Sequence, residues 1–115
     1  MPAKRLMSKA KRGEVWIVDL GLAAKVRPCL VLSIPASDEE RSLVTAVAHT
    51  TSPRGGRFEV AVRALFLKGG VFDAQNLVTI PDAKLIRCVG TLRREDLASV
   101  ENAVRAWLGL GSAAS

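Results

Sequence analysis

The fold is decided by the stretch KVRPCLVLS at residues 25–33, in which a cationic loop leads directly into a buried strand. Residues 30–32 form a continuous apolar run, which is typical of a strand covered on both faces. Pro28 has no N–H for a strand ladder, so we expect it at the first position of that strand. Proline also holds the preceding residue extended, which places Arg27 at the rim of a rigid element. At that rim Arg27 is either a binding or catalytic group or a solvated surface arginine.

The segments on either side of this stretch predict further short strands. Residues 14–20 place apolar side chains on one face, and the turn at residues 21–25 joins them to the central stretch as a hairpin. Residues 43–50 alternate as a third strand, which runs into the polar cluster HTTS. The glycine-rich basic turn PRGGR at residues 53–57 then leads back into a strand over residues 58–62.

The C-terminal third combines strand patterns with one helix. Residues 71–80 have an apolar pattern interrupted by polar side chains, and residues 84–90 alternate as a strand. A helix is predicted from residue 94 to a stop at Gly109, and Leu108 and Leu110 widen its apolar stripe either for a partner or for packing within the chain. Short strands at this spacing followed by one helix predict a mainly β fold, a small β-barrel with a C-terminal α-helix. The helical stripe consists of Leu97, Val100, Val104 and Trp107.

Composition limits the class of protein. With 115 residues the chain is expected to form a single domain with its own core. No apolar run approaches the roughly 18 residues of a membrane span, and residues 1–12 lack the apolar centre of a secretory signal, so we expect a cytoplasmic protein with no membrane contact. Cys29 and Cys88 lie in apolar, strand-like contexts and are predicted to be small core residues. With one histidine and no Cys/His cluster, we expect no metal site and no cofactor.

The net charge of +6 is concentrated at the N-terminus. Five of the 17 Lys and Arg residues lie in the first twelve positions, which leaves 12 basic against 11 acidic side chains in the rest. We therefore expect a flexible basic tail over residues 1–11, a single domain over residues 12–110 and a short flexible tail over residues 111–115. The basic tail either raises non-specific affinity for nucleic acid or only improves solubility. The five basic residues are Lys4, Arg5, Lys9, Lys11 and Arg12.

Several motifs together resemble the MazF/PemK toxins of bacterial type II toxin–antitoxin systems. In chain order they are RGEVWIVDL at 12–20, VRP at 26–28 with LVLS at 30–33, TTS at 50–52 with FEV at 58–60, QN at 75–76 before TI at 79–80, GTL at 90–92, and WLGL at 107–110. No single motif is decisive, but their order and spacing are specific, and the resemblance covers about residues 11–110.

The resemblance implies an SH3-like β-barrel with a C-terminal helix that forms a homodimer. Active members of the family are metal-independent, sequence-specific endoribonucleases that inhibit translation and growth. They cleave single-stranded RNA to 2′,3′-cyclic phosphate and 5′-hydroxyl ends. A cognate MazE-like antitoxin occupies the RNA groove and blocks it. These properties are implied by the family and not by the composition.

The resemblance assigns catalytic roles to Arg27 and Thr50. Arg27 matches the family's catalytic arginine, and its planar guanidinium suits phosphate oxygens. Thr50 matches the active-site threonine, whose hydroxyl can bond a phosphate oxygen or orient Arg27. Thr51 is expected to contact the RNA through a second hydroxyl or its backbone N–H. The alternative for both threonines is that they only close the hairpin turn.

The chain departs from many relatives at two places. The loop before the Arg-Pro motif is short, and Lys25 is its sole charge. Relatives often carry an acid followed by Gln where this chain has Gln75 and Asn76. Amides hydrogen-bond nucleobases, so we expect Gln75 and Asn76 to read substrate rather than transfer protons. Asp73 can substitute for the missing acid only if the conformation of its loop places it at the site.

Three more residues are predicted to contact the substrate. His49 has a side chain suited to proton transfer at neutral pH, but strand alternation favours a core or groove-lining position. Arg54 and Arg57 either contact phosphate or form a solvated turn. The alternative to a ribonuclease is a non-catalytic binding module of the same fold, either a gyrase-inhibitor-like toxin or a decayed toxin that still binds an antitoxin.

Overall fold

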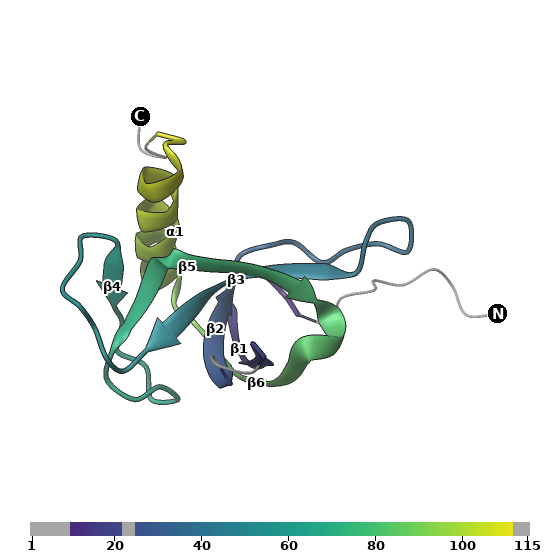
Figure 1. Cartoon of the computed structure of the whole chain (residues 1–115), viewed down its shortest axis with the longest axis horizontal. Helices are drawn as coiled ribbons and strands as arrows, with labels where there is room; N and C mark the ends of the chain where they lie inside the picture. Colours follow the sequence, from purple (N-terminus) through teal and green to yellow (C-terminus); the bar gives the residue numbers. More distant parts are fainter. Residues whose placement is uncertain (1–9, 22–24, 112–115) are drawn as a thin grey trace.

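The computed structural model describes residues 10–21 and 25–111 of the chain. Six strands and one α-helix make up these described residues, so the mainly β prediction is confirmed (Figure 1). A 3₁₀ turn, Asp82–Lys84, separates the last two strands. The elements are β1 (Glu14–Asp19), β2 (Val26–Val31), β3 (Leu43–Thr50), β4 (Glu59–Ala61), β5 (Val71–Pro81), β6 (Leu85–Thr91) and α1 (Arg94–Leu108).

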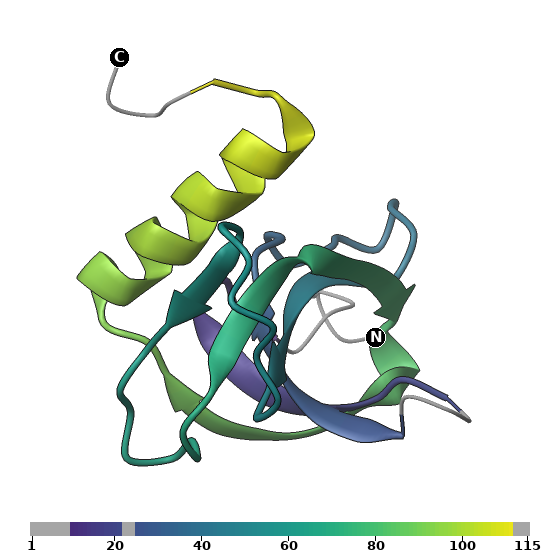
Figure 2. The ribbon, with the colours of Figure 1, turned by 60° about the vertical axis from the view of Figure 1, so that its left-hand side comes forward.

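The strands form one antiparallel sheet in the order β4-β5-β3-β2-β1-β6. Figure 2 shows the sheet curling into a barrel with α1 packed against its outside. In the described part of the chain β4 and β6 are the edges and do not pair with each other, so the barrel is partly open. The loop at residues 62–70 crosses between these edges, because the Phe66 ring lies against Gly90 of β6 so closely that a Cβ there would overlap it.

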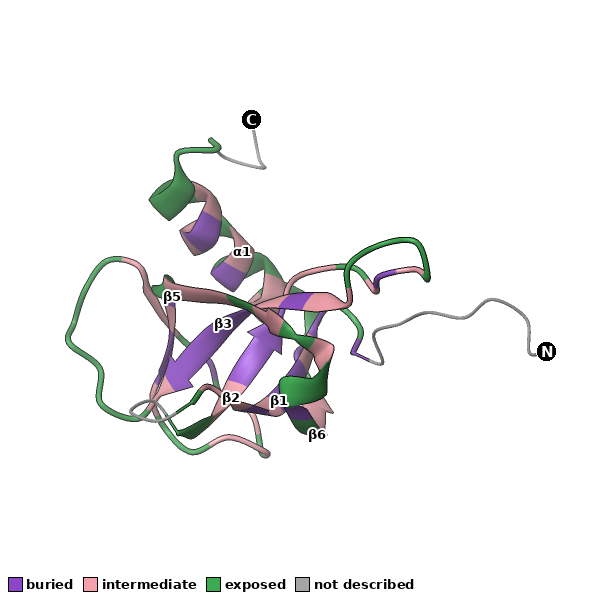
Figure 3. Cartoon of the chain, turned by 45° about the vertical axis from the view of Figure 1, so that its right-hand side comes forward, coloured by how far each residue is buried: buried purple, intermediate pink, exposed green. Residues whose placement is uncertain are grey.

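The two faces of β2 belong to two parts of the core, which explains its continuous apolar run. Cys29 and Val31 pack with Trp16 in a cluster inside the curled sheet, whereas Leu30 packs with Val100 of α1 in a second cluster. Figure 3 shows the buried centres of β2 and β3. Each large aliphatic side chain buried in this way contributes about 1.5–3 kcal/mol. The predicted two-sided burial of this strand is therefore confirmed.

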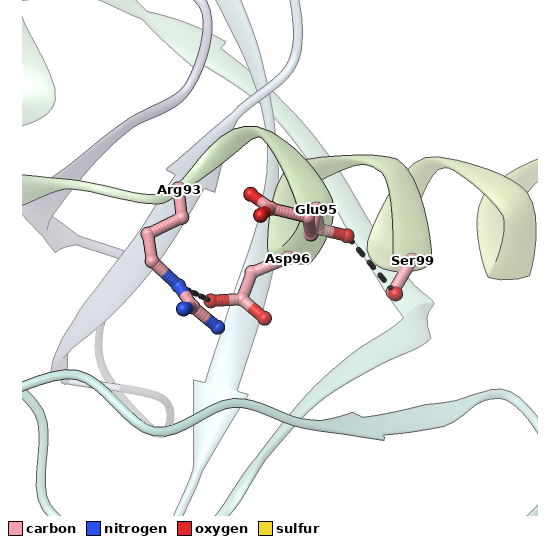
Figure 4. Close-up of polar contacts among 4 residues, drawn as sticks. All are labelled: Arg93, Glu95, Asp96 and Ser99. Carbon is pink, nitrogen blue, oxygen red and sulfur yellow. Dashed lines mark hydrogen bonds and ion pairs between the residues drawn. The ribbon is translucent and has the colours of Figure 1, made fainter.

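The helix α1 begins after Arg93 and has acidic side chains in its first turn, where they favour the positive end of the helix dipole. Arg93 Nε donates a hydrogen bond to Asp96 Oδ2 at 3.3 Å, and Ser99 Oγ donates one to the Glu95 carbonyl oxygen at 3.1 Å (Figure 4). The predicted stop is also confirmed, because Gly109 takes the left-handed φ of 70° that ends many helices.

The C-terminal end of α1 remains apolar and exposed. The ring centroids of Trp107 and Phe58 are 5.4 Å apart, so Trp107 ties the helix to the segment before β4. Leu108 and Leu110 are 48% and 66% exposed, so packing within the described chain does not cover them. Of the described helices, none is both long and apolar enough to cross a membrane.

Two expectations about the strands are wrong. Pro28 lies inside β2, which begins at Val26, because Pro28 faces Ile17 of β1 while pairing with β3 starts only after it. Cys88 is exposed rather than buried, because it lies on the edge strand β6. Cys29 is fully buried as expected.

The predicted tails lie mostly outside the described residues, which exclude residues 1–9 and 112–115. Ala10 falls within the predicted N-terminal tail, yet it is buried in the inner cluster. Arg12 forms an ion pair with Glu101, which joins the start of the domain to α1.

Candidate functional site

A pocket opens where β2 and β3 separate. β2 pairs with β3 only from Cys29, which faces Ala48, to Val31. Pro28 offers no N–H that would extend this ladder, so residues 26–28 run beside the end of β3 without pairing to it. The first pocket has a volume of about 440 Å³. Its described lining consists of Val26, Arg27, Pro28, His49, Thr50, Thr51, Ser52, Phe66, Leu67 and Lys68.

A second pocket, of about 400 Å³, adjoins the first. Arg27, Thr50 and Ser52 line both pockets and form their shared wall. The two residues predicted to be catalytic are thus brought together at the boundary between two cavities. The remaining described lining of the second pocket is Ala48, Arg54, Glu59, Asp73 and Asn76.

The shared wall presents donors to a ligand. Thr50 Oγ1 accepts a hydrogen bond from the Ser52 N–H at 3.0 Å, which leaves the hydroxyl proton for another acceptor. Thr50 therefore helps to close the turn, as the structural alternative supposed, and still faces both pockets. In the inner core cluster, burial raises the pKa of the Cys29 thiol to about 12, so this thiol is a neutral packing group and not a nucleophile.

A bulge in β5 brings acid and amide groups into the second pocket. The pairs Val47–Leu77 and His49–Phe72 are two residues apart on β3 but five residues apart on β5. The extra residues of β5 break the alternation, and Asp73 and Asn76 both line the pocket. Gln75 between them is exposed and lines neither pocket. The interrupted apolar pattern of residues 71–80 was the sequence signal for this bulge.

The loop at residues 62–70 supplies the far side of the first pocket. Gly70 has φ 147°, and a Cβ at this position would overlap the carbonyl oxygen of Thr50, so only glycine allows the chain to pass this close. Phe66 is held against β6 as described above, and Lys68 lies between these two anchors on the pocket wall. Sequence reasoning missed Lys68, because only the tertiary fold brings this loop to Thr50.

His49 is a buried member of the first pocket. It is 3% exposed, its ring meets Phe72 edge-on at 5.0 Å, and Nε2 has no hydrogen-bond partner among the described residues. Burial lowers the pKa of the imidazole, so His49 is neutral at pH 7. Strand alternation favoured a core or groove-lining position, and in the structure His49 is both buried and part of the pocket lining.

The basic turn between β3 and β4 is held by an acid. The Glu59 carboxylate accepts hydrogen bonds from the backbone N–H groups of Arg54, Gly55 and Gly56. These bonds lower the pKa of the Glu59 carboxyl. Arg54 lines the second pocket, whereas the Arg57 guanidinium lies 4.6 Å from the centre of the Phe58 ring and lines neither pocket.

Lys25 is exposed and lines neither pocket. Its backbone closes the β1–β2 hairpin, because the Leu20 N–H donates to the Lys25 carbonyl oxygen at 2.7 Å and Lys25 takes a positive φ of 56°. In the described residues no group of three or more His, Cys, Asp or Glu side chains is arranged to hold a metal ion. The site therefore offers guanidinium, ammonium, hydroxyl, amide and carboxylate groups.

Comparison with known proteins shows the family of the chain. Residues 11–108 match the family described as the PemK-like, MazF-like toxin of type II toxin–antitoxin systems. The chain belongs to this family. As a MazF-like toxin it is similar to solved structures from two groups of bacteria, and the matches span nearly the full length of those proteins.

A mycobacterial endoribonuclease in complex with its cognate antitoxin is 27% identical, with 89% of this chain and 97% of that chain covered and a TM-score of 0.76. The Mycobacterium tuberculosis toxin MazF-mt6 is 28% identical, with 85% and 98% covered and a TM-score of 0.71. A MazE–MazF structure from Deinococcus radiodurans is 24% identical, with 87% and 95% covered and a TM-score of 0.72, and this likeness bears on the fold alone.

Proposed function

We propose that this MazF-like toxin is a metal-independent, sequence-specific endoribonuclease that cleaves single-stranded RNA to 2′,3′-cyclic phosphate and 5′-hydroxyl ends, and so inhibits translation and growth. The observation that carries the proposal is the shared wall, where Arg27 and Thr50 stand between two cavities. A phosphate at this wall has one neighbouring nucleotide in each pocket. The mycobacterial relative that is an endoribonuclease supports the same activity.

Arg27 and Thr50 act on the phosphate that is cut. The ribose 2′-oxygen attacks phosphorus, the bond to the 5′-oxygen breaks, and the 5′-oxygen takes up a proton from water. Arg27 binds the non-bridging oxygens and stabilises the charge that develops on them, which is often the largest catalytic contribution. The Thr50 hydroxyl donates a hydrogen bond to the same oxygens, because Oγ1 is already oriented by the Ser52 N–H.

We assign removal of the 2′-hydroxyl proton to Asp73. Its carboxylate lines the second pocket with Arg27 and Thr50, and Oδ1 is oriented by the Gln75 N–H at 3.0 Å. His49 is the alternative base, and its neutral imidazole is suited to the step. Its Nε2 is buried, however, so Asp73 is the more accessible acceptor.

The deciding experiment is an RNA cleavage assay in EDTA with mapped product ends, comparing the native chain with Arg27→Ala. We expect discrete cuts with cyclic-phosphate ends, and a loss of about 10²–10³-fold in rate for the variant. A folded native protein that cuts no RNA in a diverse pool but still binds an antitoxin would instead favour the non-catalytic module.

We further propose a homodimer and a MazE-like antitoxin that occupies the RNA groove. The apolar end of α1, with Leu108 and Leu110 exposed, supports an interface between two copies. The antitoxin-bound relative from mycobacteria supports the second partner. A chain that stays monomeric at micromolar concentration in light scattering would contradict the homodimer. Because RNA is the substrate, we place the protein in the cytoplasm.

We also propose the domain limits predicted from the sequence. A single domain over residues 12–110 is supported by the family match over residues 11–108. Deleting residues 1–9 tests the basic tail: we expect unchanged cleavage specificity and a weaker salt dependence of RNA binding, because phosphate contacts set that dependence.

A further inference from the structure

The Glu59 carboxylate is surrounded by the backbone of the basic turn. Oε2 accepts the Arg54 N–H at 2.9 Å, and Oε1 accepts the N–H groups of Gly55 at 2.8 Å and Gly56 at 3.2 Å. Successive backbone N–H groups that converge on one anion form a cradle of the kind that binds phosphates in other proteins. Here the anion comes from the chain itself.

The turn is fixed from its other end as well. The Glu59 N–H donates back to the Gly56 carbonyl oxygen at 3.2 Å, and Gly55 takes a φ of 78° that the turn requires. Phe58, the residue just before Glu59, packs against Trp107 of α1. The backbone of residues 54–58 is therefore tied both to β4 and to the helix, which leaves the Arg54 side chain as the part that faces a ligand.

Arg54 lines the second pocket together with Arg27 and Thr50, and Glu59 lines it too. We propose that Glu59 is a positioning residue that holds the turn so that Arg54 binds the RNA phosphate next to the one that is cut. This inference rests on the proposed function. Three N–H groups already donate hydrogen bonds to the Glu59 carboxylate, so its negative charge repels an approaching phosphate less than a free carboxylate would.

The test compares Glu59→Ala, Arg54→Ala and the double variant in RNA cleavage and in binding of an RNA with a 2′-deoxy residue at the cut site. The matched control is Glu40→Ala, because Glu40 Oε1 also accepts a backbone N–H, from Ser37 at 2.9 Å, in a loop that lines neither pocket. We expect Glu59→Ala to raise KM about three- to tenfold, no more than Arg54→Ala does, with kcat within about twofold, as for loss of one phosphate contact.

The double variant decides whether Glu59 acts through Arg54. If it does, the double variant has the KM of Arg54→Ala alone, because the two changes remove the same interaction. Hydrogen exchange of the Arg54, Gly55 and Gly56 amides gives a readout without RNA, and we expect faster exchange in Glu59→Ala but not in Glu40→Ala.

Two results would overturn the inference: additive effects of the two substitutions, or tighter RNA binding by Glu59→Ala, which would mean that the carboxylate occupies a phosphate site. A native chain that neither binds nor cuts RNA would refute the proposed function instead. In that case the exchange experiment still shows whether Glu59 holds the turn.

Discussion

The two pockets share the wall of Arg27, Thr50 and Ser52 but offer different chemistry on either side of it. The first has an apolar floor and the Lys68 ammonium, and none of the described residues that line it carries a carboxylate. The second sets Arg54 against Glu59 and Asp73. For the proposed ribonuclease, this difference suits the first pocket to holding a nucleotide by charge and apolar contact, and the second to proton transfer and to reading a base.

The largest effect that tests this comparison is expected from Asp73→Asn. The amide keeps an oxygen for the Gln75 N–H but cannot take a proton, so kcat should fall roughly 100-fold with little change in KM. His49→Gln, on the first-pocket side, should change kcat by less than about threefold. Single-turnover cleavage at pH 7 measures both, and the reverse ranking would move the base to the first pocket.

A smaller effect is expected from the cations on each side. Lys68→Ala and Arg54→Ala should each raise KM about three- to tenfold and lower the salt slope of RNA binding by about 0.7–1, because each removes one phosphate contact. Lys84→Ala, on the exposed 3₁₀ turn, is the control. RNAs shortened on one side of the cut sharpen the test. Lys68→Ala should have no effect on an RNA shortened on one side of the cut, and Arg54→Ala should have none on an RNA shortened on the other side. If both substitutions lose their effect with the same shortened RNA, the two pockets do not hold nucleotides on opposite sides of the cut.

Base reading in the second pocket is expected to depend on Asn76. Replacing it with Ala should reduce discrimination at one position beside the cut by roughly tenfold, while cleavage of the best sequence changes less, because an amide that reads a base edge contributes mainly to selectivity. Sequencing the cleavage products of a randomised RNA pool measures this. The same substitution at Gln75, which lines neither pocket, should leave the preference unchanged.

The smallest effect concerns stability and pH. Burial lowers the folded-state pKa of His49, so the unfolded chain binds a proton more readily than the folded one. The contribution of neutral His49 to the free energy of unfolding is therefore complete above the unfolded-state pKa of about 6.5, and it is lost as the pH falls below that value. Urea unfolding between pH 5 and 8 should show this loss in the native chain and less of it in His49→Gln. If the free energy of unfolding changes equally with pH in the native chain and in His49→Gln, groups other than His49 cause the pH dependence.

Local pattern predicted most of the elements of this protein. The LVL run indicated a strand covered on both faces, and the helix limits followed from acidic residues at its start and Gly109 at its end. The predictions for Pro28 and Cys88 were wrong for the same reason. Whether a strand position is paired or covered depends on its neighbours in the sheet, and the order β4-β5-β3-β2-β1-β6 is not a local property.

The sequence by itself determined the mainly β fold and the family, and through the family it predicted Arg27 and Thr50 as the catalytic pair, because periodicity, motifs and their order along the chain can be read without the tertiary structure. Only the tertiary structure decided that a bulge turns Asp73 and Asn76 into the second pocket, that the loop carrying Lys68 reaches Thr50, and that Glu59 holds the Arg54 turn. Each of these depends on contacts between segments far apart in the chain or on a register shift between strands, which residue order alone does not specify.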